Sequence, residues 1–101
     1  MLTHMRQGKR LVIKLQGEID HHTAAAIRDE MDTLIWRYPV ETLIVDVRNV
    51  TFMDSSGIGV LIGRYRIMNR MGGTLRVRGA RDQVDRILEF AGIYKICQKE
   101  A

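Results

Sequence analysis

The sequence predicts a single α/β domain built on a mixed sheet of four to five strands, with its helices packed mainly on one face. Apolar segments with the two-residue period of strands alternate along the chain with segments whose apolar residues recur at helical spacing. The 101 residues are enough for one hydrophobic core but not for two. No linker, repeat or low-complexity stretch interrupts the pattern. We therefore assign residues 1–101 to one domain.

The composition is that of a folded globular protein, with 46% hydrophobic and 28% charged residues. The chain has no apolar run long enough to span a membrane, and its amino-terminal residues lack the apolar centre of a secretion signal. We expect a cytoplasmic protein without a membrane partner. Cys97 is the only cysteine, which excludes an internal disulfide and a multi-thiolate metal site, so we expect it to act as a small apolar residue.

The charge balance is mildly basic, with a formal net charge of +4. Such a balance favours acidic partners, whether a protein surface, a nucleotide or nucleic acid. The arginines, however, are scattered and lack the interleaved aromatic residues of a single-strand binding platform. We expect them on solvated helical faces, and we expect no nucleic-acid partner. They are Arg64, Arg66, Arg70, Arg76, Arg78, Arg81 and Arg86.

The first segment predicts a hairpin. Residues 2–6 fit a short edge strand, and residues 7–9 fit the turn that follows it. Residues 11–16 then show the alternation of a strand with one buried face. The residues expected on that face are Leu11, Ile13 and Leu15.

The next segment, residues 24–38, predicts an amphipathic helix. Either Asp20 or Thr23 is a suitable capping residue for its start. The helix should end before Pro39, because the residue preceding a proline is pushed out of helical geometry. Its apolar stripe is formed by Ile27, Met31, Leu34 and Tyr38.

A central strand and a second helix follow. Residues 43–47 are apolar on both faces except for Asp46, which is typical of a strand with neighbours on both sides. Residues 55–71 predict a helix that stops at the glycine pair 72–73. Its stripe is formed by Ile58, Leu61, Ile62, Tyr65 and Met68.

The last segment predicts a strand, a helix and a final short strand. Residues 74–78 alternate, so Arg76 and Arg78 should point away from the core. Strand-helix-strand units make the later strands parallel. Since two strands have one polar face, we expect the helices on the opposite side and a largely solvated remaining face. The third helix carries Val84, Ile87, Leu88 and Ala91 and ends at Gly92, and residues 94–98 are expected to form the last strand.

The most informative motif is Asp54-Ser55-Ser56-Gly57, at the junction of the central strand and the second helix. A phosphate on a serine there would lie against unpaired backbone N–H groups at a helix start. One of these serines is therefore a candidate charge switch.

Three glycines lie early in the second helix, although each should cost about 1 kcal/mol relative to alanine. One explanation is packing, because Gly59 and Gly63 are four residues apart and would share one face. The other is access, because glycine next to Ser55 and Ser56 leaves hydroxyl and N–H groups open to another protein's active site. Both explanations remain open.

Three enzymatic interpretations of this segment fail. The chain contains no phosphate-binding loop of a nucleotide hydrolase. The spacing of Gly57, Gly59 and Gly63 is one residue too long for a dinucleotide-binding fingerprint. A serine hydrolase motif would need a glycine where Met53 stands.

A second polar cluster, Asp20-His21-His22-Thr23, precedes the first helix. The adjacent histidines would point about 100 degrees apart on a helix, so we favour a loop-to-helix corner with one histidine bonded to backbone over a metal site. Asp20 and Asp54 should each stand at or just beyond the carboxyl end of a strand, where α/β sheets place their sites, unless both are only helix caps.

These two motifs, in this order, resemble those of the STAS-domain anti-sigma factor antagonists, in particular the antagonists that act in sporulation. The resemblance is carried by the residues from Gly17 to Thr23 and from Phe52 to Tyr65, and it extends through Gly72-Gly73 to Phe90-Ala91-Gly92. It covers nearly the whole chain and implies a single STAS-like domain.

The resemblance implies a regulator with no catalysis of its own, and we expect a monomer without a cofactor. In that family an anti-sigma factor that is also a serine kinase holds a sigma factor inactive, and the unmodified antagonist binds the kinase and frees the sigma factor. The family match places the phosphorylated serine at Ser55, and a serine phosphatase reverses the modification. The partner-binding surface implied for this chain comprises Asp20, His21, His22, Thr23, Asp54, Ser55, Ser56, Gly57, Ile58 and Gly59.

Two other functions remain as alternatives. A STAS-like module could sense a nucleotide or another small anion through the N–H groups near residues 55–57 and nearby arginines. Nucleic-acid binding through the basic residues would show an affinity that falls steeply with salt.

Overall fold

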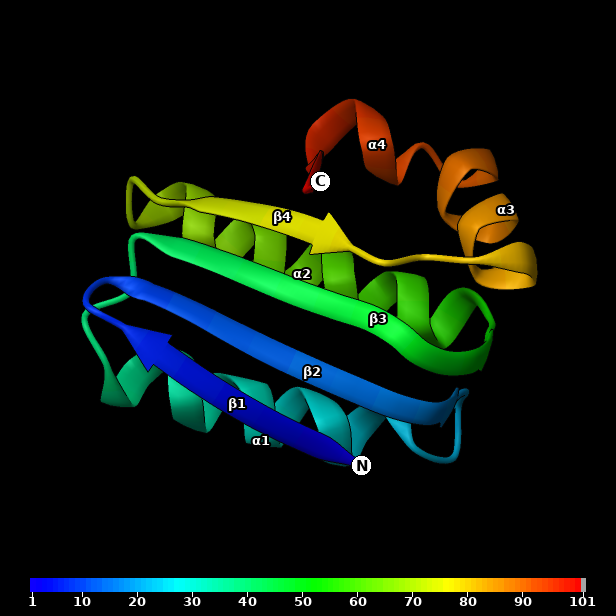
Figure 1. Ribbon diagram of the computed structural model, residues 1–101, viewed down its shortest axis with the longest axis horizontal. Coiled ribbons are helices and arrows are strands. Elements are labelled where there is room, and N and C mark those ends of the chain that lie inside the picture. Colours follow the sequence, from blue (N-terminus) through cyan, green and yellow to red (C-terminus); the bar gives the residue numbers. More distant parts are fainter. Residues whose placement is uncertain (101) are drawn as a thin grey trace.

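The computed structural model describes residues 1–100, which form one mixed five-stranded sheet and four helices (Figure 1). The strands are β1 (Leu2–Gln7), β2 (Arg10–Ile19), β3 (Thr42–Met53), β4 (Thr74–Arg78) and β5 (Gln98–Glu100). The helices are α1 (Ala24–Arg37), α2 (Ser55–Arg70), α3 (Asp82–Phe90) and α4 (Ile93–Ile96).

The strands lie in the sheet in the same order as in the sequence. β1 pairs with β2 in antiparallel fashion, and each later pair of neighbours is parallel. Gly8, with a φ of 60°, forms the turn of the β1–β2 hairpin together with Lys9. The structure therefore confirms the α/β class, the amino-terminal hairpin and the parallel arrangement of the later strands.

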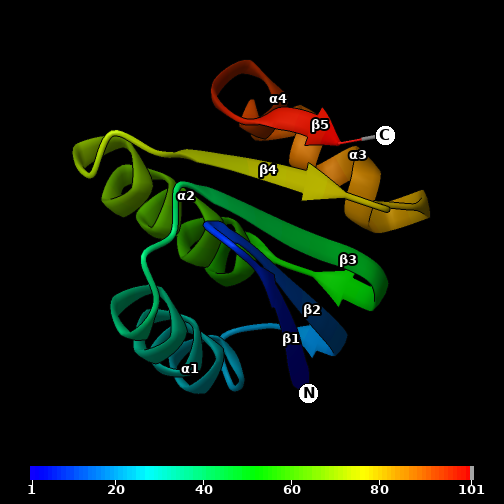
Figure 2. The ribbon, with the colours of Figure 1, turned by 60° about the vertical axis from the view of Figure 1, so that its left-hand side comes forward.

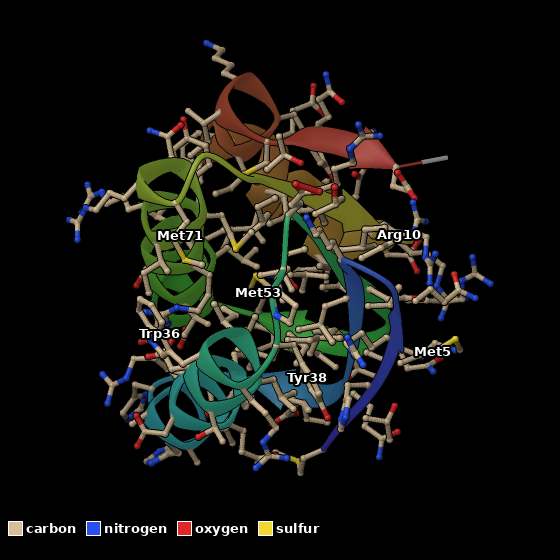
Figure 3. The ribbon with its side chains drawn as sticks, turned by 90° about the vertical axis from the view of Figure 1, so that its left-hand side faces the viewer. Met5, Arg10, Trp36, Tyr38, Met53 and Met71 are labelled. Atoms are coloured by element: carbon tan, nitrogen blue, oxygen red, sulfur yellow. The ribbon has the colours of Figure 1, made fainter. Side chains whose placement is uncertain are left out.

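The helices α1 and α2 lie side by side on one face of the sheet, as Figure 2 shows. Figure 3 shows Met53, which is completely buried, between the sheet and these helices. Met5 lies on the opposite side of the sheet, and Trp36 lies on the outer side of the helix layer. The core is thus formed between one sheet face and the helices. Its fully buried large side chains include Leu11, Ile13, Leu15, Ile27, Met31, Ile35, Leu43 and Leu61.

The helix-free face of the sheet carries the buried apolar side chains of Val12 and Ile44 and is cross-linked by charges around them. Arg78 donates to Asp46 on the neighbouring strand through both Nε and Nη2, at 3.2 and 3.1 Å. Glu100 accepts from Arg10 at 2.6 Å and from Arg76 at 3.2 Å. The two arginines of β4 lie on the face away from the core, as the alternation predicted.

The predicted last strand over residues 94–98 is wrong in position. The chain forms the short helix α4 there, and β5 begins only at Gln98. Gly92 has a φ of 77° and reverses the chain after α3. Ile93 and Cys97 are both buried, and the Cys97 N–H donates to the Ile93 carbonyl at 2.8 Å, so one helical turn brings both into the core.

Two central strands are also longer than the apolar patterns indicated. β2 continues to Ile19 through two shifts in its register with β3, one between Lys14 and Gln16 and one directly after Gly17, which has a φ of 86°. β3 continues to Met53, six residues beyond the predicted end. Helix α1 ends at Arg37 because Tyr38, which precedes Pro39, adopts extended geometry with a ψ of 150°. Among residues 1–100, no helix combines the length and apolarity needed to cross a membrane.

Candidate functional site

The candidate site lies where β2 and β3 end next to each other. Ile19 and Met53 are the last partners in the pairing of these two strands. The backbone N–H of Asp54 then donates to the carbonyl oxygen of Ile19 at 3.3 Å. Asp20 and Asp54 each follow immediately, so the sheet register brings the two sequence motifs to the same edge (Figure 1).

Asp54 caps helix α2. Its backbone is extended, and its carboxylate accepts a hydrogen bond from the Ser56 N–H at 2.8 Å. The sequence predicted unpaired N–H groups at this helix start. The Ser56 N–H is instead paired, because the Asp54 side chain caps the first turn of the helix. Ser55 is exposed and Ser56 is half-buried.

Asp20 organises the turn before α1. Its Oδ1 accepts from the backbone N–H groups of His22, at 2.9 Å, and Thr23, at 3.2 Å. The Thr23 hydroxyl accepts from the Asp20 N–H and donates to the Glu18 carbonyl, both at 3.0 Å. Burial acts to raise the pKa of Asp20, but the two backbone hydrogen bonds outweigh it and the pKa lies below its usual value.

The two histidines lie in this turn and not on the helix. The rings of His21 and His22 are 3.8 Å apart between centroids, and both residues are exposed. The backbone of His22, and not a histidine ring, makes the local hydrogen bond. Within residues 1–100, no three potential metal-ligating side chains cluster together.

Gly57 is required for close packing in the first turn of α2. A Cβ at this position would lie 2.5 Å from Cγ of Met53 and 3.1 Å from Cγ2 of Ile19. A Cβ at Gly59 or Gly63 would meet no neighbouring atom within 4 Å. The packing explanation for Gly59 and Gly63 is therefore wrong, because the close approach is made at Gly57, against the strand ends.

Gln83, which the sequence analysis did not single out, holds the end of β3. Its Oε1 accepts from the Met53 N–H at 3.1 Å, and its Nε2 donates to the Met53 carbonyl at 2.8 Å. Helix α3 thereby fixes the residue that directly precedes Asp54. The sequence contains no spacing signal for this contact, because it joins residues 30 apart through a side chain.

Arg64 is the second residue that sequence reasoning misplaced. It was expected on a solvated face, but only 7% of its surface is exposed. It lies on the side of α2 that faces α1, where its Nε is 3.0 Å from Oδ1 of Asp32. Its position four residues after the buried Val60 is the pattern that indicates a buried face.

The family model of the STAS domain matches residues 3–100, and the chain belongs to the STAS family. Within this family it resembles the anti-sigma F factor antagonist of Paenibacillus polymyxa, with 42% identity over 86 residues that cover 85% of this chain and 74% of the relative.

Solved structures agree with this placement. The unphosphorylated anti-sigma factor antagonist SpoIIAA superposes with a TM-score of 0.85 at 29% identity, covering 100% of this chain and 89% of that chain. The phosphorylated form of the Bacillus cell fate determinant SpoIIAA gives a TM-score of 0.76 at 28% identity, covering 100% of this chain and 92% of that chain.

Proposed function

We propose that the chain is an anti-sigma factor antagonist that works as a phosphorylation switch at Ser55. Its unphosphorylated form binds an anti-sigma factor that is also a serine kinase, and this releases the sigma factor. The kinase phosphorylates Ser55 and inactivates the antagonist, and a serine phosphatase restores it. The switch operates in the cytoplasm, in the transcriptional control of sporulation, and the chain itself catalyses no reaction.

The observation that carries the proposal is the exposed Ser55 at the start of α2, beside the capping carboxylate of Asp54. It stands in a chain that is 42% identical to an anti-sigma F factor antagonist. A kinase can reach this hydroxyl without any opening of the core. The neighbouring Gly59 is exposed and has no side chain, and even an added Cβ would meet no atom within 4 Å, so the approach is unobstructed.

The partner surface proposed for the unphosphorylated form combines the turn Asp20–Thr23 with the segment Asp54–Gly59. The pairing of Ile19 with Met53 supports this combination, because it sets both segments at one edge of the sheet. Asp20 and Thr23 hold the first segment through their own hydrogen bonds, so the surface is largely preformed.

Electrostatics explain why modification would abolish binding. A phosphoserine carries about −1.5 to −2 charges at neutral pH. At Ser55 the phosphate would lie beside the negatively charged Asp54 carboxylate. That carboxylate already accepts the Ser56 N–H, so this helix start stabilises a phosphate less than one whose N–H groups are all unpaired. An unpaired phosphate buried against a partner would cost several kcal/mol, equivalent to about a thousandfold or more in affinity.

Phosphate mapping tests the site. The protein is incubated with its cognate anti-sigma kinase and ATP, and the modified residue is identified by mass spectrometry. Ser55→Ala should fold, bind the kinase and remain unmodified, whereas the matched variant Ser56→Ala should still be phosphorylated. If neither serine is phosphorylated, the proposal is contradicted. If only Ser56 is phosphorylated, the switch residue is Ser56 and the assignment to Ser55 is wrong.

Affinity measurements test the charge argument. Ser55→Asp should bind the kinase more weakly than the parent, while Ser55→Asn, similar in size but neutral, should bind more tightly than Ser55→Asp. Calorimetry on the unmodified proteins measures both. Equal affinity of Ser55→Asp and the parent would show that negative charge at this position does not control the interaction.

A further inference from the structure

Trp36 is the only tryptophan of the chain, and 66% of it is exposed to solvent on α1. Met71, which directly follows α2, is 44% exposed. Figure 3 shows both residues on the outer side of the helix layer. Tryptophan contributes strongly to binding when a partner covers it, so this part of the helix layer is a candidate docking surface.

The packing of α1 against α2 places the two residues at the same end of the helix layer. The helices run in the same direction, because each connects two neighbouring parallel strands. They meet at Asp32 and Arg64, whose carboxylate and Nε are 3.0 Å apart. Trp36 lies one turn beyond Asp32 on α1, and the half-buried Ile67 and Met71 continue the side of α2 that carries Arg64. An apolar strip, consisting of Trp36, Ile67 and Met71, therefore follows the outer seam of the two helices at their carboxyl ends.

The cations near this apolar strip lack acidic partners. Arg37 directly follows Trp36, and Arg66 and Arg70 are one turn apart on α2; all three are exposed. Among residues 1–100, none of these arginines takes part in an ion pair. The surface around the strip therefore carries an excess of positive charge.

The acidic residues nearby do not compensate for this charge. Helix α2 contains no acidic residue. Of the four acids between positions 29 and 41, Glu30 lies on another side of α1 from Trp36. The other three are each paired with a different cation: Asp29 with Arg28, Asp32 with Arg64 and Glu41 with Lys9.

The composition of this surface distinguishes between classes of partner. Tryptophan, methionine and arginine are enriched in protein–protein interfaces and lysine is depleted, and α1 and α2 contain arginine but no lysine. Single-stranded nucleic acid prefers several aromatic rings on which successive bases stack, and the strip has one. A second copy of the chain would place like charges against each other around a shared strip. An acidic protein segment fits best, because it complements both the charge and the apolar surface.

We propose that the apolar strip, together with Arg37, Arg66 and Arg70, is a docking surface for an acidic protein segment. An apolar side chain of that segment covers Trp36, and its carboxylates pair with the arginines. The 16 residues of α2 separate this surface from Ser55 by about 20 Å. A partner docked here therefore leaves the start of α2 accessible.

The fluorescence of Trp36 tests the proposal directly. The full chain is titrated with a short peptide that repeats Asp-Glu-Leu, and with a neutral counterpart in which Asn-Gln-Leu replaces this unit. The acidic peptide should shift the emission to shorter wavelength in a saturable way that weakens with added salt, and the neutral peptide should bind at least about fivefold more weakly. Equal binding of the two peptides, or no saturable change, contradicts the proposal.

Two further probes examine the other classes of partner. A single-stranded oligonucleotide and vesicles of anionic phospholipid are titrated at the same concentration of negative charge as the acidic peptide. Both should bind more weakly than the peptide. Tighter binding of the oligonucleotide or of the vesicles would assign the surface to nucleic acid or to a membrane and would overturn the proposal.

Matched arginine variants locate the surface. Arg70→Gln and Arg86→Gln each remove one exposed arginine, so the two variants have the same net charge, but Arg86 lies on α3. Arg70→Gln should weaken binding of the acidic peptide about fivefold, and Arg86→Gln less than about twofold. Equal weakening would indicate a general effect of net charge and would overturn the assignment.

A second pair tests the role of the aromatic ring, with the fluorescence anisotropy of a labelled acidic peptide as the readout. Trp36→Ala should weaken binding about tenfold or more, whereas Phe90→Ala, at a 93% exposed position on α3, should leave it unchanged. Unchanged binding in Trp36→Ala contradicts the proposal. Both side chains are exposed, so neither variant should disturb the fold. The measurements use no kinase, so their failure leaves the Ser55 switch unaffected.

Discussion

The ionised carboxylate of Asp20 stabilises the turn before α1 through hydrogen bonds to the backbone. Because backbone N–H groups of His22 and Thr23 bond to it, its pKa in the folded protein is lower than in the unfolded chain. The resulting stabilisation is complete above the unfolded pKa of about 3.9 and disappears as the pH falls through the lower folded value.

The first prediction concerns this carboxylate. At pH 7 Asp20→Asn should be less stable than the parent, and the difference should shrink as the pH falls below about 4, where the parent carboxylate becomes protonated. Urea unfolding of both proteins from pH 7 to pH 3 measures the difference, and NMR titration of the side-chain carboxyl carbon gives the pKa. A pH-independent difference would show that the charged form is not what holds the turn.

Cys97 gives a second prediction at the same scale. The side chain is 2% exposed, and burial raises the pKa of its thiol to about 11. Alkylation requires the thiolate, so the native protein at pH 8 should react with iodoacetamide far more slowly than the protein in denaturant. Mass spectrometry over time measures both rates. Comparable rates would mean that the α4 segment opens readily.

At the scale of the element, helix α2 combines glycines with opposite roles. Gly57 lies against the ends of β2 and β3, where a Cβ would come within 2.5 Å of Met53. Gly63 has no neighbour within 4 Å of an added Cβ, so there glycine only lowers the stability of the helix. One residue type thus allows close packing at the start of the helix and only weakens its middle.

The third prediction follows from this contrast. Gly57→Ala should destabilise the protein by about 1–3 kcal/mol through overpacking. The matched variant Gly63→Ala should stabilise it by about 0.5–1 kcal/mol. Denaturant unfolding gives both values. If Gly57→Ala were also stabilising, the contact between the helix start and the strand ends would be looser than the structure shows.

Gln83 gives a prediction about how α3 supports the site. Gln83→Ala leaves the N–H and carbonyl of Met53 without their partners and should cost about 1–3 kcal/mol. Hydrogen exchange of the Met53 amide should accelerate more than that of Ile13 in the middle of β2. A uniform acceleration across the sheet would show only a global loss of stability.

Across the whole molecule, the proposed switch should change the surface and leave the fold intact. Ser55→Asp adds a negative charge at a helix start, and this interaction with the helix dipole is favourable. The same charge is repelled by the neighbouring Asp54. Because the two effects oppose each other at an exposed position, the free energy of unfolding of the variant should stay within about 1 kcal/mol of the parent. Denaturant unfolding measures this, with Ser55→Ala as the control, and a large loss would mean that charge disrupts the helix start.

Much of the fold could be predicted from local patterns. The periods of two and 3.6 residues identified the hairpin, three long helices and the central strand, because each of these elements buries one or both faces in a regular way. The carboxyl end of the chain was harder to predict. Ile93 and Cys97 carry the helical spacing, but a single turn provides too few positions to distinguish it from a strand.

The candidate site was predictable in its motifs but not in its supports. Asp54 and Ser55 stand at a strand-to-helix junction that the sequence shows directly. The spacing of Arg64 from Val60 indicates a buried face, but the partners of Gln83 and Arg64 depend on where α3 and α1 pack, which no local pattern encodes. Polar side chains that bridge distant elements have no periodicity, so they emerge only from the folded structure.

The adjacent ends of β2 and β3 have a consequence for recognition. Asp20 and Asp54 lie 34 positions apart along the chain and are brought to one edge by the pairing of Ile19 with Met53. A short synthetic peptide copying residues 50–60 would contain Ser55. It would lack the turn Asp20–Thr23 and the cap geometry that the sheet imposes on Asp54. The proposed partner surface would therefore be a conformational epitope, and a kinase that recognises it would distinguish the folded protein from its nascent or unfolded chain.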